Sequence, residues 1–448
     1  MKVKLILIIL CTISTITARA EMLSFDNFLQ NALKNSYEIK LAKLNKQSTE
    51  YGIKESRSGY FPTIAGYAIT ERYNNMGDST KPMTAVGNEI ILNNDYYQEM
   101  GSLIASYNLF DFGARKKTLD IAKADDKQKQ ILLFKSQRDL KFDAVDIYAE
   151  ALNLFKKQQI SNKILSLQNE LIEINERLKE AGELSEIELT DTKIETSETK
   201  TELDEIKNSL SKRLTEISYY TGKNYQLNET EIADFPKYDA EPEKTENGAI
   251  KLSAEVITLR PENSLEAKSY DLEIEKKQKE YEIQKKVNFP KIRFDTRYNL
   301  YGSDTSSFFD SFQDISQRSF ALRLSASFTL FDGFKNVNAV HKKRLEIEKT
   351  KAEKEKELAE LKKKFDQIQL DAQNAIIQEK NNKATLVLVN KNLEMTERLN
   401  VNGLIEKSKV LRKRIELLEK KQKLEETGIR NYAAKFKLQL LAGEMEGL

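Results

Sequence analysis

The residue best suited to acid–base chemistry in this chain is His341, the only histidine among 448 residues. It is followed directly by Lys342, Lys343 and Arg344. A catalytic imidazole needs a partner that orients it and a substrate site beside it, and three neighbouring cations supply neither. We therefore interpret His341 as an ordinary residue on a helix surface.

Carboxylate pairs are abundant but carry little information. The chain has 70 Asp and Glu residues and 72 Lys and Arg residues, so acidic pairs spaced three or four apart are expected from composition alone. The sequence contains no glycine-rich phosphate loop, no metal-ligand cluster and no nucleophile elbow. These observations argue against an enzyme and predict no cofactor.

The first 20 residues have the three parts of a secretory signal. Residues 1–4 are short and basic, residues 5–16 are mostly apolar, and Ala18 and Ala20 place small side chains at the −3 and −1 positions of a cleavage site before Glu21. The alternative is a membrane anchor, but an apolar run of this length is too short to cross about 30 Å of hydrocarbon. We therefore expect an exported protein.

The only cysteine, Cys11, lies inside this signal and follows Leu10 rather than a small residue, which argues against a lipoprotein site. The mature chain would then contain no disulfide, no thiol nucleophile and no cysteine metal site. Cleavage also removes Lys2, Lys4 and Arg19, which leaves a net charge of about −1. That balance gives no electrostatic footprint for nucleic acid.

Later parts of the chain predict no transmembrane helix. Charged residues make up 32% of the sequence, and no segment after the signal approaches 18 continuous apolar residues. If the protein spans a membrane, it must do so with strands.

One structural unit occurs twice in the sequence. A shift of 221 residues matches four motifs: Leu109-Phe110-Asp111 with Leu330-Phe331-Asp332, Glu176-Arg177-Leu178 with Glu397-Arg398-Leu399, Gly182 with Gly403, and Gly222 with Gly443. Upstream the shift is 228, which matches Phe61-Pro62 with Phe289-Pro290. The change of seven residues falls between Phe61 and Leu109 and predicts a longer surface loop in the first copy.

Each copy contains a long helical hairpin. No proline or glycine occurs from residue 114 to 181, and apolar residues alternate at spacings of four and three, as in a coiled-coil seam: Ile160, Ile164, Leu167, Leu171, Ile174 and Leu178. The second copy repeats the pattern from 337 to 401 through Leu358, Leu361, Phe365, Ile368, Ala372 and Ala375. Each rod of roughly 100 Å should end at Gly182 or Gly403, and a second helix should return to Tyr220 or Leu441.

Before each long helix the period changes to two, which predicts a strand hairpin. In the second copy, Phe320, Leu322, Leu324, Ala326, Phe328 and Leu330 alternate with polar residues, as do Ile292, Phe294, Thr296, Tyr298 and Leu300. The first copy is fainter, with Phe61, Thr63, Ala65, Tyr67 and Ile69 in one strand and Leu103, Ala105, Tyr107 and Leu109 in the other. These strands are long enough to cross a bilayer at a tilt.

Four such strands cannot close a barrel. An open sheet edge facing lipid would leave unpaired backbone groups that each cost several kcal/mol, so membrane insertion would require oligomerisation. A soluble arrangement, in which the helices cover a four-stranded sheet, is the alternative.

The order of these features resembles the TolC family of outer-membrane channel proteins. The motifs are the signal peptide, Asn35-Ser36-Tyr37-Glu38 at a helix, Ser58–Pro62 before the first strand, Leu109–Gly113 after the strand hairpin, Arg177–Ser185 near the tip, and Tyr220-Thr221-Gly222, followed by a second round. The resemblance covers essentially the whole mature chain. Its specificity lies in the duplicated order, because each motif alone is short.

The resemblance implies a mixed α and β fold: a homotrimer with four strands per chain that closes one 12-stranded transmembrane β-barrel, continued by a long periplasmic barrel of α-helical coiled-coil hairpins. It also implies an outer-membrane exit duct for efflux or type I secretion that works with a periplasmic adaptor and an inner-membrane transporter. The domains would be a signal peptide (1–20), a first repeat (21–221, with a strand hairpin at about 60–109 and a helical hairpin at about 114–221), a belt (222–260) and a second repeat (261–448, with hairpins at about 289–331 and 334–442).

The resemblance also implies two sets of site residues near the tip glycines. Gate candidates are Glu188, Ile405, Lys409 and Arg412, and adaptor-docking candidates are Arg177, Gly182, Leu184, Ser185, Arg398, Gly403 and Leu404. Family members with well-defined gates have acidic residues where this chain has Lys409 and Arg412, and a basic residue where it has Ile405. We therefore expect an entrance that is less cation-selective than is usual for the family, unless these side chains point away from the lumen.

A second class of protein fits part of the pattern. A secreted or periplasmic coiled-coil scaffold or adhesin would have the same helices but no pore, and its strands would not be protected by detergent.

Overall fold

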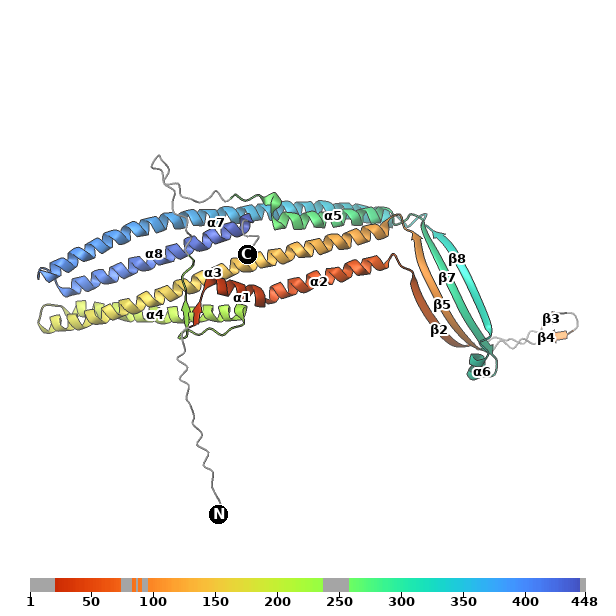
Figure 1. The fold of residues 1–448 in the computed structure, drawn as a ribbon, viewed down its shortest axis with the longest axis horizontal. Coiled ribbons are helices and arrows are strands. Elements are labelled where there is room, and N and C mark those ends of the chain that lie inside the picture. Colours follow the sequence, from red (N-terminus) through yellow and green to blue (C-terminus); the bar gives the residue numbers. More distant parts are fainter. Residues whose placement is uncertain (1–20, 74–82, 86–87, 91–95, 237–257, 444–448) are drawn as a thin grey trace, which may run out of the picture. The chain divides into compact units, whose positions relative to one another are not determined.

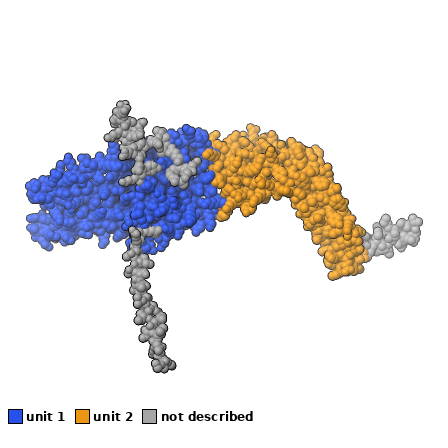
Figure 2. Space-filling model, viewed as in Figure 1, with its two compact units in different colours: residues 1–43, 132–267, 356–448 blue, residues 44–131, 268–355 orange. Residues whose placement is uncertain are grey.

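The computed structural model describes residues 21–73, 83–85, 88–90, 96–236 and 258–443. The expected signal peptide lies outside these residues, as do residues 237–257 of the expected belt. The chain divides into two compact units, one formed by residues 1–43, 132–267 and 356–448 and the other by 44–131 and 268–355 (Figure 2). Each unit therefore contains segments of both sequence repeats.

Four long helices form two hairpins (Figure 1). The first hairpin is α3 (Ala114–Glu180) followed by α4 (Glu186–Thr221), and the second is α7 (Lys335–Val401) followed by α8 (Lys407–Ala442). The predicted seam is the buried side of these helices: Ile160, Ile164, Leu171, Leu361, Phe365, Ala372 and Ala375 are all buried. A continuous apolar stripe without proline or glycine thus produces a long helix that packs along one face.

The core of the first unit surrounds Tyr148 of α3, which is fully buried. Its hydroxyl donates to the carbonyl oxygens of Leu23 at 2.9 Å and Ala233 at 2.7 Å. Leu23 is the last residue of β1 (Glu21–Leu23) and Ala233 directly follows β6 (Thr230–Ile232), and these two strands pair in parallel. Burial raises the pKa of Tyr148, so the hydroxyl remains protonated and keeps its donor role.

Shorter helices complete both units. They are α1 (Phe25–Asn35), α2 (Tyr37–Ser58), the 3₁₀ turn η1 (Pro261–Asn263) and α5 (Leu265–Lys285). In the second unit, Lys276 of α5 binds Asp125 of α3 at 2.9 Å, and Lys343 of α7 binds Glu280 of α5 at 2.7 Å. Polar contacts of this kind join the short helices to the rods.

The second unit contains a four-stranded antiparallel sheet in the order β2 (Thr63–Tyr73), β5 (Tyr96–Phe110), β7 (Lys291–Asp304) and β8 (Gln317–Ser327) (Figure 1). The last strand ends at Ser327, three residues before the expected Leu330. The first connection carries the short pair β3 (Met83–Ala85) and β4 (Asn88–Ile90), and the second carries α6 (Phe308–Gln313). The extra residues of the first copy therefore fall in a connecting loop.

The strand register sorts the side chains onto two faces. The apolar face carries Ile64, Leu103, Phe294, Tyr298, Phe320, Leu322 and Leu324. Tyr67 and Ile69, which were expected on that face, pair with Ser102 and Met100 on the polar one. That prediction was wrong because both faces of β2 carry apolar or small side chains, so its alternation contains almost no signal.

The same Asp motif connects strand to helix in both copies. Asp111 accepts hydrogen bonds from the backbone N–H groups of Gly113 at 3.1 Å and Arg115 at 3.0 Å, and Asp332 accepts from the N–H of Asn336 at 2.9 Å. Two successive residues with positive φ make each turn, in the order Phe-Gly in the first copy and Gly-Phe in the second. A carboxylate at this place satisfies free N–H groups at the helix start, which explains why the motif occurs twice.

Candidate functional site: the hairpin tips and the polar sheet face

Both tip glycines end their helices in the same way. Gly182 and Gly403 have φ angles of 78° and 72°. The N–H of the residue after each glycine donates to a carbonyl five residues earlier, Glu183 to Leu178 at 2.8 Å and Leu404 to Leu399 at 3.0 Å. This is a Schellman ending, which glycine favours because it has no Cβ to clash in the left-handed region.

The first tip restarts its helix with a capping box. Ser185 Oγ accepts from the N–H of Glu188 at 3.2 Å, and the Glu188 carboxylate accepts from the N–H of Ser185 at 3.1 Å. The Glu188 carboxylate accepts from the backbone N–H of Ser185 and also from Ser185 Oγ at 3.0 Å, and both bonds hold the pKa of Glu188 below its ordinary value; the charge of Arg412 contributes further. Glu188 therefore stabilises the start of α4 as an anion.

The second tip restarts its helix differently. Glu406 occupies the N-cap position of α8, but its side chain makes no capping hydrogen bond and instead accepts from Ser408 Oγ at 2.9 Å. The loop is closed by Asn400, whose amide donates to the carbonyl of Ile405 at 2.8 Å. The first turn of α8 contains Lys407 and no acidic residue. Positive charge at a helix N-terminus opposes the helix dipole, so this tip is less stable locally than the first.

Two ion pairs join the hairpins near their tips, within the first unit. Lys407 Nζ lies 2.7 Å from Glu170 of α3, and Arg412 Nη1 lies 3.6 Å from Glu195 of α4. All four side chains are about half exposed, so each pair contributes little by itself. Together they set a cationic start of α8 against an acidic first hairpin.

The structure brings together only some of the expected gate residues. Arg412 lies close enough to Glu188 for its charge to lower the pKa of that carboxyl, while Ile405 is partly buried. Lys409 is exposed and, within the described residues, forms no ion pair. Sequence reasoning missed Lys407, Glu170 and Glu195, because their pairing depends on two hairpins whose relative register the repeat does not encode.

The expected docking residues gather at the exposed ends of the hairpins. Arg177 is exposed and lies 3.8 Å from Glu173, Arg398 and Ser185 are exposed, and Leu184 is partly buried. Large apolar side chains protrude beside the second glycine: Val401 is 84% exposed and Leu404 68% exposed. Exposed apolar groups of this size on a hairpin end are typical of a contact surface.

The polar face of the sheet is a second region with organised chemistry. Ser102 Oγ donates to Asn299 Oδ1 at 2.7 Å, and the Asn299 amide donates to Tyr301 Oη at 2.8 Å and Ser319 Oγ at 3.1 Å. Nearby, Ser106 Oγ donates to Asp295 at 2.7 Å. This network fixes the side chains across three strands of the sheet.

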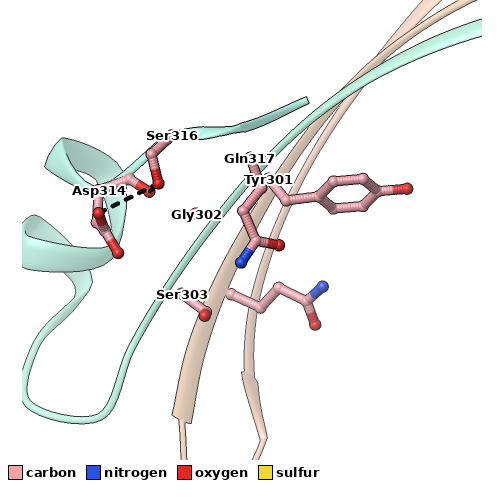
Figure 3. Close-up of a pocket in the computed structure, with 7 residues that line it drawn as sticks. Tyr301, Gly302, Ser303, Asp314, Ser316 and Gln317 are labelled. Atoms are coloured by element: carbon pink, nitrogen blue, oxygen red, sulfur yellow. Dashed lines mark hydrogen bonds between the residues drawn. The ribbon is translucent and has the colours of Figure 1, made fainter. Parts of the chain in front are cut away.

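A shallow pocket of about 210 Å³ lies at the end of the sheet where β7 ends and β8 begins (Figure 3). It is lined by Gln98, Tyr301, Gly302, Ser303, Asp314, Ser316 and Gln317. Ser316 Oγ lies 3.4 Å from Asp314 Oδ1, but the lining includes no histidine or lysine that could serve with them as a general base. A Cβ on Gly302 would lie 2.2 Å from the Ser311 carbonyl oxygen, so this glycine allows α6 to pack closely against β7. We interpret the pocket as a by-product of that packing.

In the segments that the structure describes, no cluster of three or more His, Cys, Asp or Glu side chains could hold a metal ion. None of the helices described is both long and apolar enough to cross a membrane.

Long paired helical hairpins, a four-stranded sheet with one apolar and one polar face, and glycine-capped tips define a channel-type architecture. The model of the outer membrane efflux protein family matches residues 28–223 and 261–444. The chain belongs to this family. The resemblance noted in the sequence is thereby confirmed, together with an outer-membrane location and a role in efflux.

Solved structures have the same fold at low sequence identity. The chain is similar to VceC from Vibrio cholerae (14% identity, TM-score 0.73, covering 94% of this chain and 96% of that one) and to CmeC from Campylobacter jejuni (13%, 0.76, 94% and 85%). It is also similar to the open state of MtrE from Neisseria gonorrhoeae (12%, 0.67, 94% and 88%). No curated protein sequence matches the chain. VceC is an outer-membrane protein, and CmeC and MtrE are outer-membrane channels. The family is one of efflux channel proteins rather than a class of enzymes, and the scaffold or adhesin alternative is not favoured.

Proposed function

We propose that three copies of this chain close a 12-stranded barrel in the outer membrane, and that their helical hairpins form a periplasmic duct leading to it. The observation that carries this proposal is the one-sided sheet with two open edges, β2 and β8. Phe320, Leu322 and Leu324 are each more than 60% exposed on its apolar face. Such a face fits lipid, but unpaired edges do not, and pairing between copies satisfies them.

The test is reconstitution of the mature protein into a planar bilayer. We expect discrete conductance steps and a trimer that survives mild detergent and dissociates on heating. A matched pair of variants probes the faces: Leu322→Arg on the apolar face should impair insertion, while Ala321→Arg, its neighbour on the polar face, should insert. A soluble monomer without conductance would overturn the proposal.

The domain organisation follows the duplication. Residues 1–20 act as a cleaved signal peptide, residues 21–221 and 261–448 are the two structural repeats, and residues 222–260 form a belt around the helical duct. Determination of the N-terminal residue of the exported protein tests the first of these boundaries, since we expect it to be Glu21.

The partners are a periplasmic adaptor and an inner-membrane transporter, in an efflux or type I secretion system. The docking surface comprises Arg177, Gly182, Leu184, Ser185, Arg398, Gly403 and Leu404, and the protruding Val401 and Leu404 support it. A photo-crosslinker at Leu404 should capture an adaptor in intact cells, whereas one at Lys349 on the exposed helix face of the second unit should not. Equal capture at both positions would contradict docking at the tips.

The entrance of the duct is gated near Glu188, Ile405, Lys409 and Arg412, with Lys409 and Arg412 making its field less cation-selective. Two observations support this gate: Lys409 and Arg412 are exposed, and the charge of Arg412 lowers the pKa of Glu188. Exchanging both cations for glutamate should shift the reversal potential under a salt gradient toward cation preference. Unchanged selectivity in that variant would show that these side chains do not face the lumen.

A further inference from the structure

The polar face of the sheet carries more positive than negative charge. The strand register places four cations on it, Lys291, Arg293, Arg297 and Arg323, against two carboxylates, Asp295 and Glu71. The hydrogen-bonded network of Ser102, Asn299 and Ser319 lies on the same face. The apolar face opposite contributes none of these charges.

The four cations are free to act on a solute. All four are exposed, and across the described part of the chain none of them forms an ion pair. Arg293 donates one long hydrogen bond, 3.4 Å, to Asn108. Asp295, which is cross-strand from Arg323, accepts a hydrogen bond from Ser106 at 2.7 Å. The charge of the cations is therefore only partly compensated.

Their spacing makes a continuous cationic band. Four successive rows on the same face of the sheet carry these charges: Lys291, Arg293, Asp295 with Arg323 opposite it, and Arg297. At about 3.3 Å per residue these rows extend over roughly 20 Å. They lie at the N-terminal end of β7. Toward the other end the rows at Asn299 and Tyr301 are uncharged.

We propose that this band makes the strand section of the duct select for anions, so that it passes small anionic solutes more readily than cationic ones. The inference rests on the proposed closed trimer, because only there does the polar face enclose the water path. Each chain contributes an excess of two positive charges, and threefold symmetry repeats them around the lumen. Rings of Arg and Lys side chains are the usual basis of anion selectivity in pores.

The experiment measures the reversal potential of the reconstituted protein across a potassium chloride gradient at low ionic strength, where screening is weak. Wild-type pores should be more permeable to chloride than to potassium. Replacing Arg293, Arg297 and Arg323 by glutamine should lower the chloride-to-potassium permeability ratio by at least about twofold, since a unit charge about 8 Å away in water changes local ion concentration by that order.

Matched variants exclude trivial explanations. Arg318→Gln alters the same residue type on the same strand as Arg323, but the register places it on the apolar face beside Leu300, so it should leave the ratio unchanged. Replacing the three arginines by lysine should preserve anion preference, which controls for folding.

The outcomes are distinct. Pores that favour potassium, or a glutamine triple variant that conducts with the wild-type ratio, would overturn the inference while leaving the channel function intact. A folded protein that never conducts would instead refute the proposed channel, and this inference with it.

Discussion

The two hairpin tips have the same backbone ending but opposite starts. At the first tip, Ser185 and Glu188 form a capping box, and the first turn of α4 is acidic. At the second, Glu406 makes no capping hydrogen bond, and Lys407 begins a basic helix. The duplication thus retained the glycine geometry and reversed the charge. Cations of α8 also join the hairpins within one chain, through the pairs of Lys407 with Glu170 and of Arg412 with Glu195, whose carboxylates lie outside the first turn of α4.

Because the two tips share one backbone ending, their local stability should depend equally on Gly182 and Gly403. Gly182→Ala and Gly403→Ala should each destabilise their tip by about 1–2 kcal/mol, because a Cβ is strained in the left-handed region. Neither site has another atom within 4 Å of that Cβ, so conformation alone sets the cost. Hydrogen exchange at tip amides measures the effect. Gly428→Ala, in the interior of α8, is the control and should stabilise the protein by about 0.5–1 kcal/mol.

The N-caps of α4 and α8 should respond unequally to substitution. Ser185→Ala should cost about 1 kcal/mol of local stability in the first turn of α4, because it removes the hydroxyl that accepts from Glu188 N–H. Glu406→Ser should protect the first turn of α8, which has no such bond at present. Amide exchange in the first turn of each helix reads out both changes. A loss of protection in α8 on Glu406→Ser would mean that the tips do not differ in the way described.

The charge reversal should be measurable as pairwise coupling. A double-mutant cycle of Arg412→Gln with Glu195→Gln should give about 0.2–1 kcal/mol, because both side chains are half exposed. The Lys407–Glu170 pair should behave similarly, and salt should weaken both. The free energy of local unfolding, measured at two ionic strengths, is the readout. Coupling that persists in high salt would contradict an electrostatic origin.

Acidification should weaken the start of α4 at the first tip. The pKa of Glu188 is lowered in the folded protein, so its stabilising effect is complete above the ordinary value of 4.5 and is lost as the pH falls through the lower folded value. An NMR titration should therefore find the Glu188 carboxyl more acidic than usual, and Ser185→Ala should return it toward normal.

Much of the architecture could be predicted from short-range patterns. The absence of proline and glycine from 114 to 181, together with the seam from Ile160 to Leu178, predicts α3 nearly to the residue. The alternation in Phe320–Leu324 correctly predicts which side chains of β8 lie on the apolar face. The faint alternation in β2 gave the wrong face for Tyr67 and Ile69, because these large side chains lie on the polar face. The tip glycines were identifiable, but the cap difference required the observed hydrogen bonds.

The sequence by itself determined the helices, the tips and the duplication, because helix periodicity, glycine endings and the Asp motif act over a few neighbouring residues. Only the tertiary structure decided which charges meet. The pairs of Lys407 with Glu170 and of Arg412 with Glu195 join helices that are far apart in the sequence. Strand register alone places Arg323 opposite Asp295. Such pairings depend on how whole elements align, and a shift of one residue in a strand would move every charge to the other face.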